Sequence, residues 1–573
     1  MRKLFPLISL MALIVMFFTP AAVAVSSGAG DVLVITGKVA NAQGKGVKDA
    51  AIEVMVNGQK LHLKEELVTL KDGKYHAELT LPAGALPAAK LELQVKKPAY
   101  LDSEPLAPAQ VLKHYIDEKG APHYLASLNM TIKRIITPAF WIATLVLLAV
   151  YVLIAFELMH RTLAAVLGGA LLLTISYTAG TFNPAYFIVS FEDAMKAIDM
   201  NVIFLLMAMM IIVGVMNKTG VFQWLAYKSF QVAKGNVYIL IGIMMFITAF
   251  VSAFLDNVTT MLLIIPVTME IASTLKINPI AMLLPEAFAS NVGGTATLIG
   301  DPPNIIIGSY AKLTFVDFVS HLAIICFLCL IVTIVWYLWW YKEGYQKAVV
   351  KDVPRMIAYL HELYKITNAK LLAIGGAILG ITIFLFIVQG VLHMEPSVAA
   401  LIGAAVLLVL SRVDIVEMLE HEIEWPTLIF FMFLFVVVSG VEEAGLIQVI
   451  ADWVKDMSQG SKVVAIIMIL WVSAIASAFI DNIPFTATML PIVAYLTEEI
   501  PEAQTGVLWW ALSLGVCLGG NGTMIGASAN VVTAGLAEKA GYPVSFMAYM
   551  KATWWPMIIT VAMANAWLLL VEK

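Results

Sequence analysis

Two stretches, SAFLDNVTTMLLIIP at 252–266 and SNVGGTATLIGDPPN at 290–304, decide how this chain folds. Each returns in the second half, as SAFIDNIPFTATMLP at 477–491 and as CLGGNGTMIGASAN at 517–530. All matched positions of the first pair share one spacing, and those of the second pair share a spacing one residue longer. The chain therefore contains two related halves with matched polar, glycine-rich motifs.

These polar motifs lie in sequence apolar enough to enter a membrane. A carboxylate or amide in the middle of a bilayer is costly unless it is paired or wetted, and irregular backbone is tolerated there only where it lines a cavity. A simple helix kink needs one Pro or Gly, whereas this pattern repeats at many positions. Such matched motifs are typical of secondary transporters with internal repeats.

The composition supports a membrane protein and argues against several other classes. Of the 573 residues, 61% are hydrophobic and 13% are charged, which places most of the chain in a membrane. A net charge of −5 gives no basic surface for nucleic acid. The three cysteines lie in apolar segments and are expected to pack, without disulfides. The membrane half has no ligand cluster or Ser-His pair, so we expect no enzyme activity.

The first 135 residues differ in kind from the rest. Residues 1–24 have a basic start, an apolar run and Ala22-Val23-Ala24, which fits either a secretory signal peptide or a first membrane span. Residues 25–135 alternate apolar and polar side chains between turn residues, which predicts a small antiparallel β-sandwich. We expect this sandwich on the extracytoplasmic side, in a structural or docking role.

The remainder is expected to be mainly α-helical and polytopic. Residues 136–341 form the first membrane repeat and 371–573 the second, and the Lys and Arg residues of 342–370 mark a cytoplasmic linker. Counting crossings from an external sandwich gives the repeats opposite orientations, so they are inverted. Each repeat is predicted to contain a re-entrant hairpin and a broken helix, at 237–274 and 279–310, and again at 463–496 and 507–536.

The predicted ion or substrate site draws on both motifs of both repeats. Its carboxylates, amides, hydroxyls and glycines are Asp256, Asn257, Thr259, Ser290, Asn291, Gly293, Gly294, Thr295, Thr297, Asp301, Asn304, Asp481, Asn482, Thr486, Gly519, Gly520, Asn521, Thr523, Ser528 and Asn530. Sodium prefers hard oxygen ligands, which broken helices offer as free carbonyls beside side-chain amides. We expect sodium at Asp256, Asn257, Asn291, Asp481, Asn482 and Asn521. The four glycines are expected to adopt backbone angles that turn carbonyls or amides toward the cavity.

The acidic residues suggest how two fluxes are coupled. The proton affinity of a carboxylate depends on its burial and on nearby cations, so an aspartate that exchanges a proton for sodium couples their movements. We expect Asp256 and Asp481 in this role, with Asp301 and Glu286 as acids present in one repeat only. Glu286 is either a third proton-coupling group or a buried, hydrogen-bonded helix residue. Several carboxylates around one cavity repel an anion, which favours cation exchange.

Three segments carry a resemblance to a known family. EAFASNVGGTATLIGDPPNIII at 286–307, SLGVCLGGNGTMIGASANVVTAGLAEKAGYPVSF at 513–546 and FELMHRTLAAVLGG at 156–169 resemble the P protein (pink-eyed dilution) branch of the ion transporter superfamily. That superfamily also holds ArsB arsenite permeases, NhaD sodium/proton antiporters and sodium-coupled dicarboxylate and citrate carriers. The resemblance, over 139–573, implies a homodimer in which each protomer has a scaffold and a transport domain that moves as an elevator.

The sequence departs from the dicarboxylate carriers at the hairpin tips. Those carriers have Ser-Asn-Thr where this chain has Asp256-Asn257-Val258-Thr259 and Asp481-Asn482-Ile483-Pro484. The replacement of Ser by Asp argues against a direct carry-over of anion binding.

The combined expectation is an ion-coupled secondary transporter of the bacterial inner membrane that exchanges sodium for protons by an elevator-type mechanism. The alternative is a sodium- or proton-coupled carrier of an anion, namely citrate or a dicarboxylate, chloride or arsenite. The expected partners are membrane lipid, the small ion or anionic solute, and a second copy of the chain. Sodium is expected as a coupling or transported ion, with no other cofactor.

Overall fold

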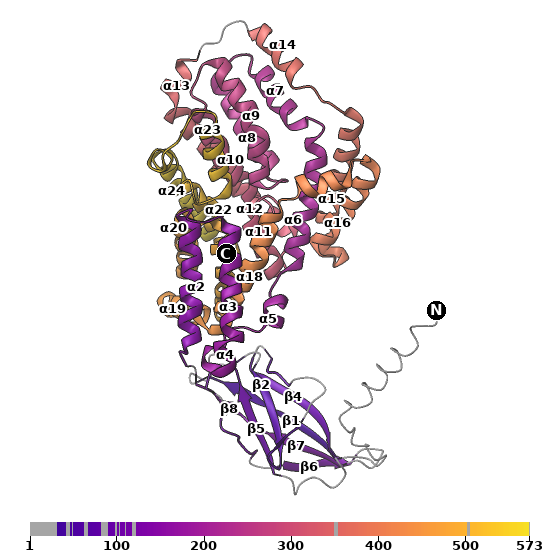
Figure 1. Cartoon of the computed structure of the whole chain (residues 1–573). Helices are drawn as coiled ribbons and strands as arrows, with labels where there is room; N and C mark the ends of the chain where they lie inside the picture. Colours follow the sequence, from indigo (N-terminus) through magenta and orange to yellow (C-terminus); the bar gives the residue numbers. More distant parts are fainter. Residues whose placement is uncertain are drawn as a thin grey trace, which may run out of the picture. The chain divides into compact units, whose positions relative to one another are not determined.

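A computed structural model describes residues 31–571 except 42–45, 48–49, 62–66, 71, 82–89, 98–99, 102, 109–110, 117–121, 134, 349–352, 501–502 and 504. The predicted signal peptide or first span at 1–24 lies outside the described residues. The chain divides into two compact units between Ile136 and Thr137. The first is built of strands and the second of helices (Figure 1).

The first unit contains two β-sheets. Its strands are β1 (Asp31–Ala40), β2 (Ala51–Val56), β3 (Gln59–Lys60), β4 (Lys74–Leu81), β5 (Leu91–Lys96), β6 (Val111–Ile116), β7 (Pro122–Ser127) and β8 (Met130–Thr131). One sheet has the order β4-β1-β7-β6, with β8 also paired to β1, and the other has the order β3-β2-β5. Alternate residues such as Leu33, Ile35, Ile52, Leu93 and Val95 are buried in one core, because side chains of a strand point to opposite faces.

The prediction that this unit is purely antiparallel was wrong. Strand β1 pairs antiparallel with β4 but parallel with β7, with Val32 opposite His123, and parallel with β8. The alternation of side chains fixes which residues face the core. It does not fix which strand lies beside β1, because that depends on contacts between residues far apart in the chain.

The second unit is helical. Its first part contains α2 (Pro138–Ala155), α3 (Arg161–Tyr177), α4 (Ala179–Phe182), η1 (Pro184–Tyr186), α5 (Phe191–Lys196), α6 (Met200–Asn217), α7 (Val221–Ala233), α8 (Val237–Ser252), α9 (Asn257–Leu275), α10 (Ile280–Thr295), α11 (Pro302–Ala311) and α12 (Phe315–Trp340). Helices α13 (Lys342–Gln346) and α14 (Val353–Leu363) follow. The rest contains α15 (Ala369–Leu392), α16 (Pro396–Ser411), α17 (Ile415–Glu417), η2 (Met418–Glu422), α18 (Trp425–Ala444), α19 (Leu446–Ser458), α20 (Lys462–Phe479), α21 (Asn482–Glu499), α22 (Val507–Gly519), η4 (Gly520–Gly522), α23 (Ser528–Lys539) and α24 (Phe546–Leu570).

The membrane character and the duplicated hairpins are confirmed. Nine helices in the described part of the chain are long and apolar enough to cross a membrane. Helices α8 and α9 form the first predicted hairpin, and α20 and α21 form the second. Each hairpin is followed by a broken helix, α10 and α11 in the first repeat and α22 to α23 in the second. The fold is therefore that of a polytopic membrane protein with two matched repeats.

The glycines of the motifs allow close helix packing. A Cβ atom on Gly293 would lie 2.0 Å from the carbonyl oxygen of Ala249 in α8, and one on Gly519 would lie 2.4 Å from that of Ala474 in α20. The expected special backbone angles are absent: Gly519 and Gly520 have φ of −62° and −54°, and Gly293 and Gly294 lie within α10. The glycines are needed because each broken helix touches the backbone of its hairpin, where no side chain fits.

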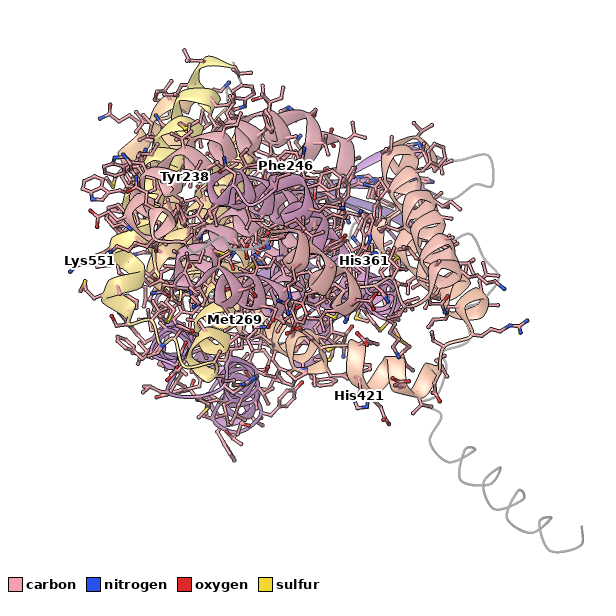
Figure 2. All side chains as sticks on the ribbon, turned by 90° about the horizontal axis from the view of Figure 1, so that it is seen from above. Tyr238, Phe246, Met269, His361, His421 and Lys551 are labelled. Carbon is pink, nitrogen blue, oxygen red and sulfur yellow. The ribbon has the colours of Figure 1, made fainter. Side chains whose placement is uncertain are left out.

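Several helices were not predicted. Helices α7 and α19 occupy matching places after α6 and α18, and they pack against the hairpins α8-α9 and α20-α21 respectively. The predicted linker also contains helices, and His361 of α14, labelled in Figure 2, stacks edge-on against Tyr227 of α7. These helices contain charged residues and are short, so a search for long apolar spans does not find them.

We expect Gly293→Ala to lower the free energy of unfolding by about 3 kcal/mol, because the added methyl group meets backbone that cannot move away. Thermal unfolding in detergent measures this effect. Gly376→Ala in α15 is the matched control, since nothing lies within 4 Å of its Cβ position. Equal melting temperatures for the two variants would contradict the packing explanation.

Candidate functional site

A chain of side-chain amides joins the two repeats. Asn257, at the start of α9, donates from Nδ2 to Oδ1 of Asn291 in α10 at 2.9 Å. Asn291 in turn donates from Nδ2 to Oδ1 of Asn521 at 2.9 Å and to Oδ1 of Asn530 at 3.0 Å. All four amides are buried. The first hairpin is therefore hydrogen-bonded, through one asparagine, to the broken helix of the second repeat.

The two helix breaks are closed in the same way. Asn304 donates from Nδ2 to the carbonyl oxygens of Thr295 and Thr297, at 3.0 and 2.9 Å. Its counterpart Asn530 donates to the carbonyl oxygens of Gly520 and Thr523, at 2.9 and 3.0 Å. A helix that stops inside a membrane leaves carbonyl groups without partners. One asparagine in each repeat satisfies two of them.

The remaining polar residues of the breaks mostly hold the fold together. Thr297 donates to the carbonyl oxygen of Ala253 at 2.5 Å, and Thr523 makes the matching bond to Ala478. The hydroxyls of Thr295 and Thr486 donate to carbonyls of their own helices, and Ser290 donates to Ser252. These hydroxyls link each broken helix to its hairpin or brace the helix that carries them.

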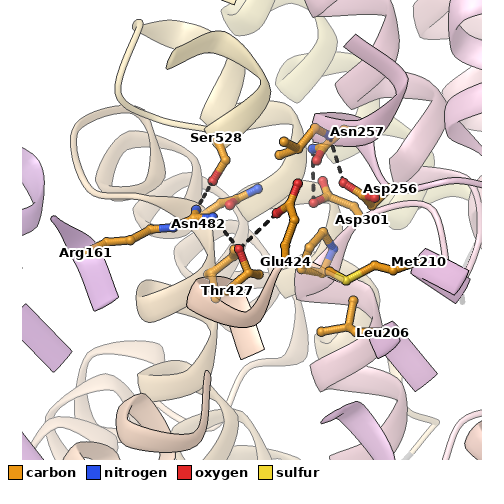
Figure 3. A pocket seen from close by; sticks show the side chains of 13 residues that line it. Arg161, Leu206, Met210, Asp256, Asn257, Asp301, Glu424, Thr427, Asn482 and Ser528 are labelled. Atoms are coloured by element: carbon orange, nitrogen blue, oxygen red, sulfur yellow. Dashed lines mark hydrogen bonds between the residues drawn. The ribbon is translucent and has the colours of Figure 1, made fainter. Parts of the chain in front are cut away.

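One buried cavity lies where the two hairpin tips meet the other helices (Figure 3). Its volume is about 20 Å³, which is enough for one water molecule or a small ion. The lining residues are Arg161, Leu206, Met210, Asp256, Asn257, Val258, Asp301, Pro302, Glu424, Thr427, Asn482, Ile483 and Ser528. The cavity thus gathers residues from both repeats and from α3, α6 and α18.

Three carboxylates lie in the lining, together with the guanidinium of Arg161. Asp256 caps α9, with Oδ1 accepting from the backbone N–H groups of Val258 and Thr259 at 3.0 Å each. Asp301 is fully buried, and its Oδ1 accepts from Asn257 Nδ2 at 3.3 Å. Glu424, which precedes α18, accepts from the Thr427 hydroxyl at 3.0 Å. Three acidic side chains therefore face a space the size of one small ion.

Three buried polar atoms of the site have no hydrogen-bond partner among the described residues. They are Asp301 Oδ2, Asn482 Nδ2 and Asn521 Nδ2. A buried polar atom left without a partner costs free energy. Asn482 and Cys517 both lie close to the Asp301 carboxyl group. Asp301 and Asn482 both line the cavity. Over the described ranges, no three His, Cys, Asp or Glu side chains are close enough to ligate one metal ion.

Asp481 is not among the lining residues of this cavity but contacts two that are, Arg161 and Ser528. Its Oδ1 accepts from the N–H of Ile483 at 3.0 Å, as a cap of α21. Its Oδ2 lies 3.7 Å from Nη1 of Arg161 and accepts from the Ser528 hydroxyl at 3.3 Å. Asp256 and Asp481 thus occupy matching caps, but only Asp256 lines the cavity.

Glu286 lies apart from the cavity. It is buried in α10, and both of its carboxylate oxygens accept from the hydroxyl of Thr268 in α9, at 3.1 and 2.9 Å. Of the two interpretations of Glu286, this placement supports the hydrogen-bonded helix residue. Its role in proton coupling stays a prediction.

The sequence interpretation did not include Arg161, Glu424 or Thr427 in the site. Arg161 was part of the HRTLAA segment, where a charged residue begins an apolar helix, and Glu424 directly precedes the apolar α18. A charged residue at the start of a membrane helix is a usable signal. Glu424 precedes α18 as Asp199 precedes the matching helix α6, so a comparison of the two repeats points to Glu424 but not to Arg161.

We expect Asn304→Ala and Asn530→Ala each to lower the free energy of unfolding by about 1–3 kcal/mol, because each leaves two buried carbonyls unsatisfied. Thermal unfolding in detergent measures the loss. Asn278→Ala removes one exposed hydrogen bond and serves as the comparison. Effects on the two buried variants no larger than that of Asn278→Ala would show that the breaks do not need these amides.

Comparison with known proteins gives a consistent result. The family model described as "Citrate transporter" (CitMHS) matches residues 151–515. An uncharacterized transporter of Mycobacterium tuberculosis is 39% identical over 430 residues, which cover 74% of this chain and 97% of that protein. The P protein of Homo sapiens is 34% identical over 504 residues, covering 75% of this chain and 59% of that protein. The crystal structure of the Alcanivorax borkumensis YdaH transporter aligns with a TM-score of 0.46 and 14% identity, over 72% of this chain and 98% of that one.

Proposed function

This chain belongs to the citrate transporter family CitMHS and is a secondary transporter of that type; we propose that the ions it exchanges are sodium and protons. The observation that carries this proposal is the charge and size of the cavity. Asp256, Asp301 and Glu424 line a space of about 20 Å³, and the neighbouring guanidinium of Arg161 already faces Asp481. A small cation suits that environment, because it is attracted by carboxylates that repel an anion.

Asp301 is the group best placed to hold either a proton or the cation. One of its oxygens accepts from Asn257, and the other has no partner among the described residues. An unpaired carboxylate charge is costly in such a buried place. The Asp301 carboxyl group therefore takes a proton when the cation leaves. Because it binds either the proton or the cation but not both, the two ions move in opposite directions. Asp256 and Asp481, at the two hairpin tips, take part in the same exchange.

The proposed motion is an elevator. The two hairpins and the two broken helices form the moving part. They are joined by the hydrogen bonds of the Asn291 side-chain amide. Helices α2, α3 and α18, which pack on one another, belong to the fixed part. We propose a homodimer in the bacterial inner membrane, with the strand unit on the extracytoplasmic side and membrane lipid around the helices.

A second function has one observation in its favour. Arg161 holds Ser528 and Thr427 beside it, at 2.5 and 3.0 Å, and a guanidinium flanked by hydroxyls can bind a carboxylate. The family description also names citrate. A citrate ion needs far more room than the present cavity offers, so this alternative requires the cavity to open around Arg161.

Proteoliposomes with an imposed sodium gradient test the proposal. We expect sodium to drive proton movement in the wild-type protein, and we expect Asp256→Asn and Asp301→Asn each to reduce this exchange at least about 100-fold, because both remove a charge that the cation needs. Asp414→Asn, which alters an exposed helix cap outside the cavity, is the matched control and keeps the wild-type rate.

Uptake of citrate, chloride and arsenite is then measured in the same vesicles, with an imposed sodium gradient or an imposed pH gradient. If citrate accumulates when a sodium or proton gradient is imposed, and no sodium/proton exchange occurs without citrate, the alternative replaces the proposed function. If Asp301→Asn exchanges sodium for protons at the wild-type rate, the Asp301 carboxylate is not part of the coupling mechanism. Glu286→Gln, tested alongside, decides between the two interpretations of that residue.

A further inference from the structure

Arg161 lies between helices α3 and α18 and the tip of the second hairpin. It is the first residue of α3, and α3 packs against α2 and α18. Its guanidinium contacts Thr427 and the ring of Phe430 on α18, and on the other side Ser528 of α23 and Asp481 at the tip of the second hairpin. Its side chain is 22% exposed. The same charge therefore reaches the proposed fixed part and the proposed moving part.

The two hairpin aspartates differ most at the second oxygen, although Asp256 Oδ1 accepts from two backbone N–H groups and Asp481 Oδ1 from one. In both, Oδ1 caps the following helix. The second oxygen of Asp256 accepts from the Thr259 hydroxyl of its own helix. In the second repeat, the position that corresponds to Thr259 is Pro484, which has no hydroxyl to donate. The second oxygen of Asp481 is thus left for partners outside its own helix.

The second repeat supplies those outside partners, and the first lacks them. Ser528, which donates to Asp481, corresponds to Pro302 in the first repeat, and proline has no side-chain donor. Arg161 approaches Asp481, and among the described residues no ion pair is made by Asp256. Two substitutions between the repeats thus act together: one frees an oxygen of Asp481, and the other helps to hold that oxygen toward Arg161.

We propose that Arg161 and Asp481 form a latch that fixes the tip of the second hairpin to helices α3 and α18 in this state. The latch opens when the hairpin moves, so Arg161 is a positioning residue for transport and not an ion ligand. The inference rests on the proposed alternating access, because only a moving hairpin needs a releasable ion pair. Asp256, without this contact, remains available to the cavity.

Hydrogen exchange of the hairpin tip tests the latch without requiring any transport. We expect the amides of residues 480–488 to exchange about tenfold faster in Arg161→Gln and in Asp481→Asn, since loss of the ion pair frees the tip. Asparagine caps helices as well as aspartate does, so Asp481→Asn keeps the end of α21 intact. Arg161→Lys, which keeps the charge and loses the forked geometry, should give an intermediate rate.

The double variant distinguishes a latch from two unrelated losses. Because both single changes break one contact, Arg161→Gln with Asp481→Asn should exchange no faster than either alone. Tyr151→Phe is the comparison: Tyr151 of α2 donates to the carbonyl oxygen of Pro484 at 2.9 Å, a neutral tie of the same hairpin, and its effect should multiply with that of Arg161→Gln. Wild-type exchange in either single variant, or multiplied effects in the Arg161–Asp481 pair, would overturn the latch.

Sodium-dependent thermal stabilisation of the same variants separates this inference from the proposed function. Arg161→Gln should still gain stability from sodium, whereas Asp256→Asn should not. If sodium stabilises none of these proteins, including the wild type, the proposed sodium/proton exchange fails. The amide hydrogen-exchange rates still decide whether the latch exists. Loss of sodium stabilisation in Arg161→Gln alone would make Arg161 part of the ion site and overturn its assignment as a latch.

Discussion

The carbonyl groups freed at a helix break must find hydrogen-bond donors inside the protein, because the hydrocarbon around a membrane helix supplies none. Asn304 and Asn530 meet this requirement at the two breaks. Each lies in the helix that follows its break and reaches back to carbonyls of the preceding segment. This constraint explains why the asparagine recurs in both copies of the motif, irrespective of which ion is carried.

A second consequence of the amide network is mechanical. Asn291 belongs to the first repeat, yet both of its donated hydrogen bonds end on the second. The glycine contacts join each broken helix to its own hairpin through the backbone. Displacement of one hairpin against the other would break several buried hydrogen bonds at once, each costly when left unmade. The two halves of the polar core are therefore held together by buried hydrogen bonds.

Much of this arrangement could be predicted from the sequence, because duplication makes the important residues visible twice. The hairpins with Asp256 and Asp481 at their tips, and the breaks after Gly293 and Gly519, follow from matched motifs in apolar surroundings. Arg161 could not be found in that way, because it reaches the site only through folding. Glu424 has a counterpart in Asp199 before α6, but the polar motifs did not include either position. The parallel pairing of β1 with β7 was missed for a similar reason: it joins segments that local alternation does not connect.

The glycines show where a correct residue was given a wrong reason. Their spacing marked the helix breaks, but their backbone angles are those of ordinary helices. Their function is to be small where two backbones touch, which only the packed structure reveals. Helices α7 and α19 were overlooked because their charged residues conceal a buried face.

The side-chain amides of Asn482 and Asn521, each with an Nδ2 that has no hydrogen-bond partner among the described residues, have a property that carboxylates lack. Half a turn about its last side-chain bond exchanges the oxygen of an amide for its nitrogen, at almost no change in shape. In one orientation the amide presents its oxygen, which can accept a hydrogen bond or contact a cation. In the other it presents its NH2 group, which can donate a hydrogen bond to an anion. The orientation that each amide adopts is therefore set by the donors and acceptors around it.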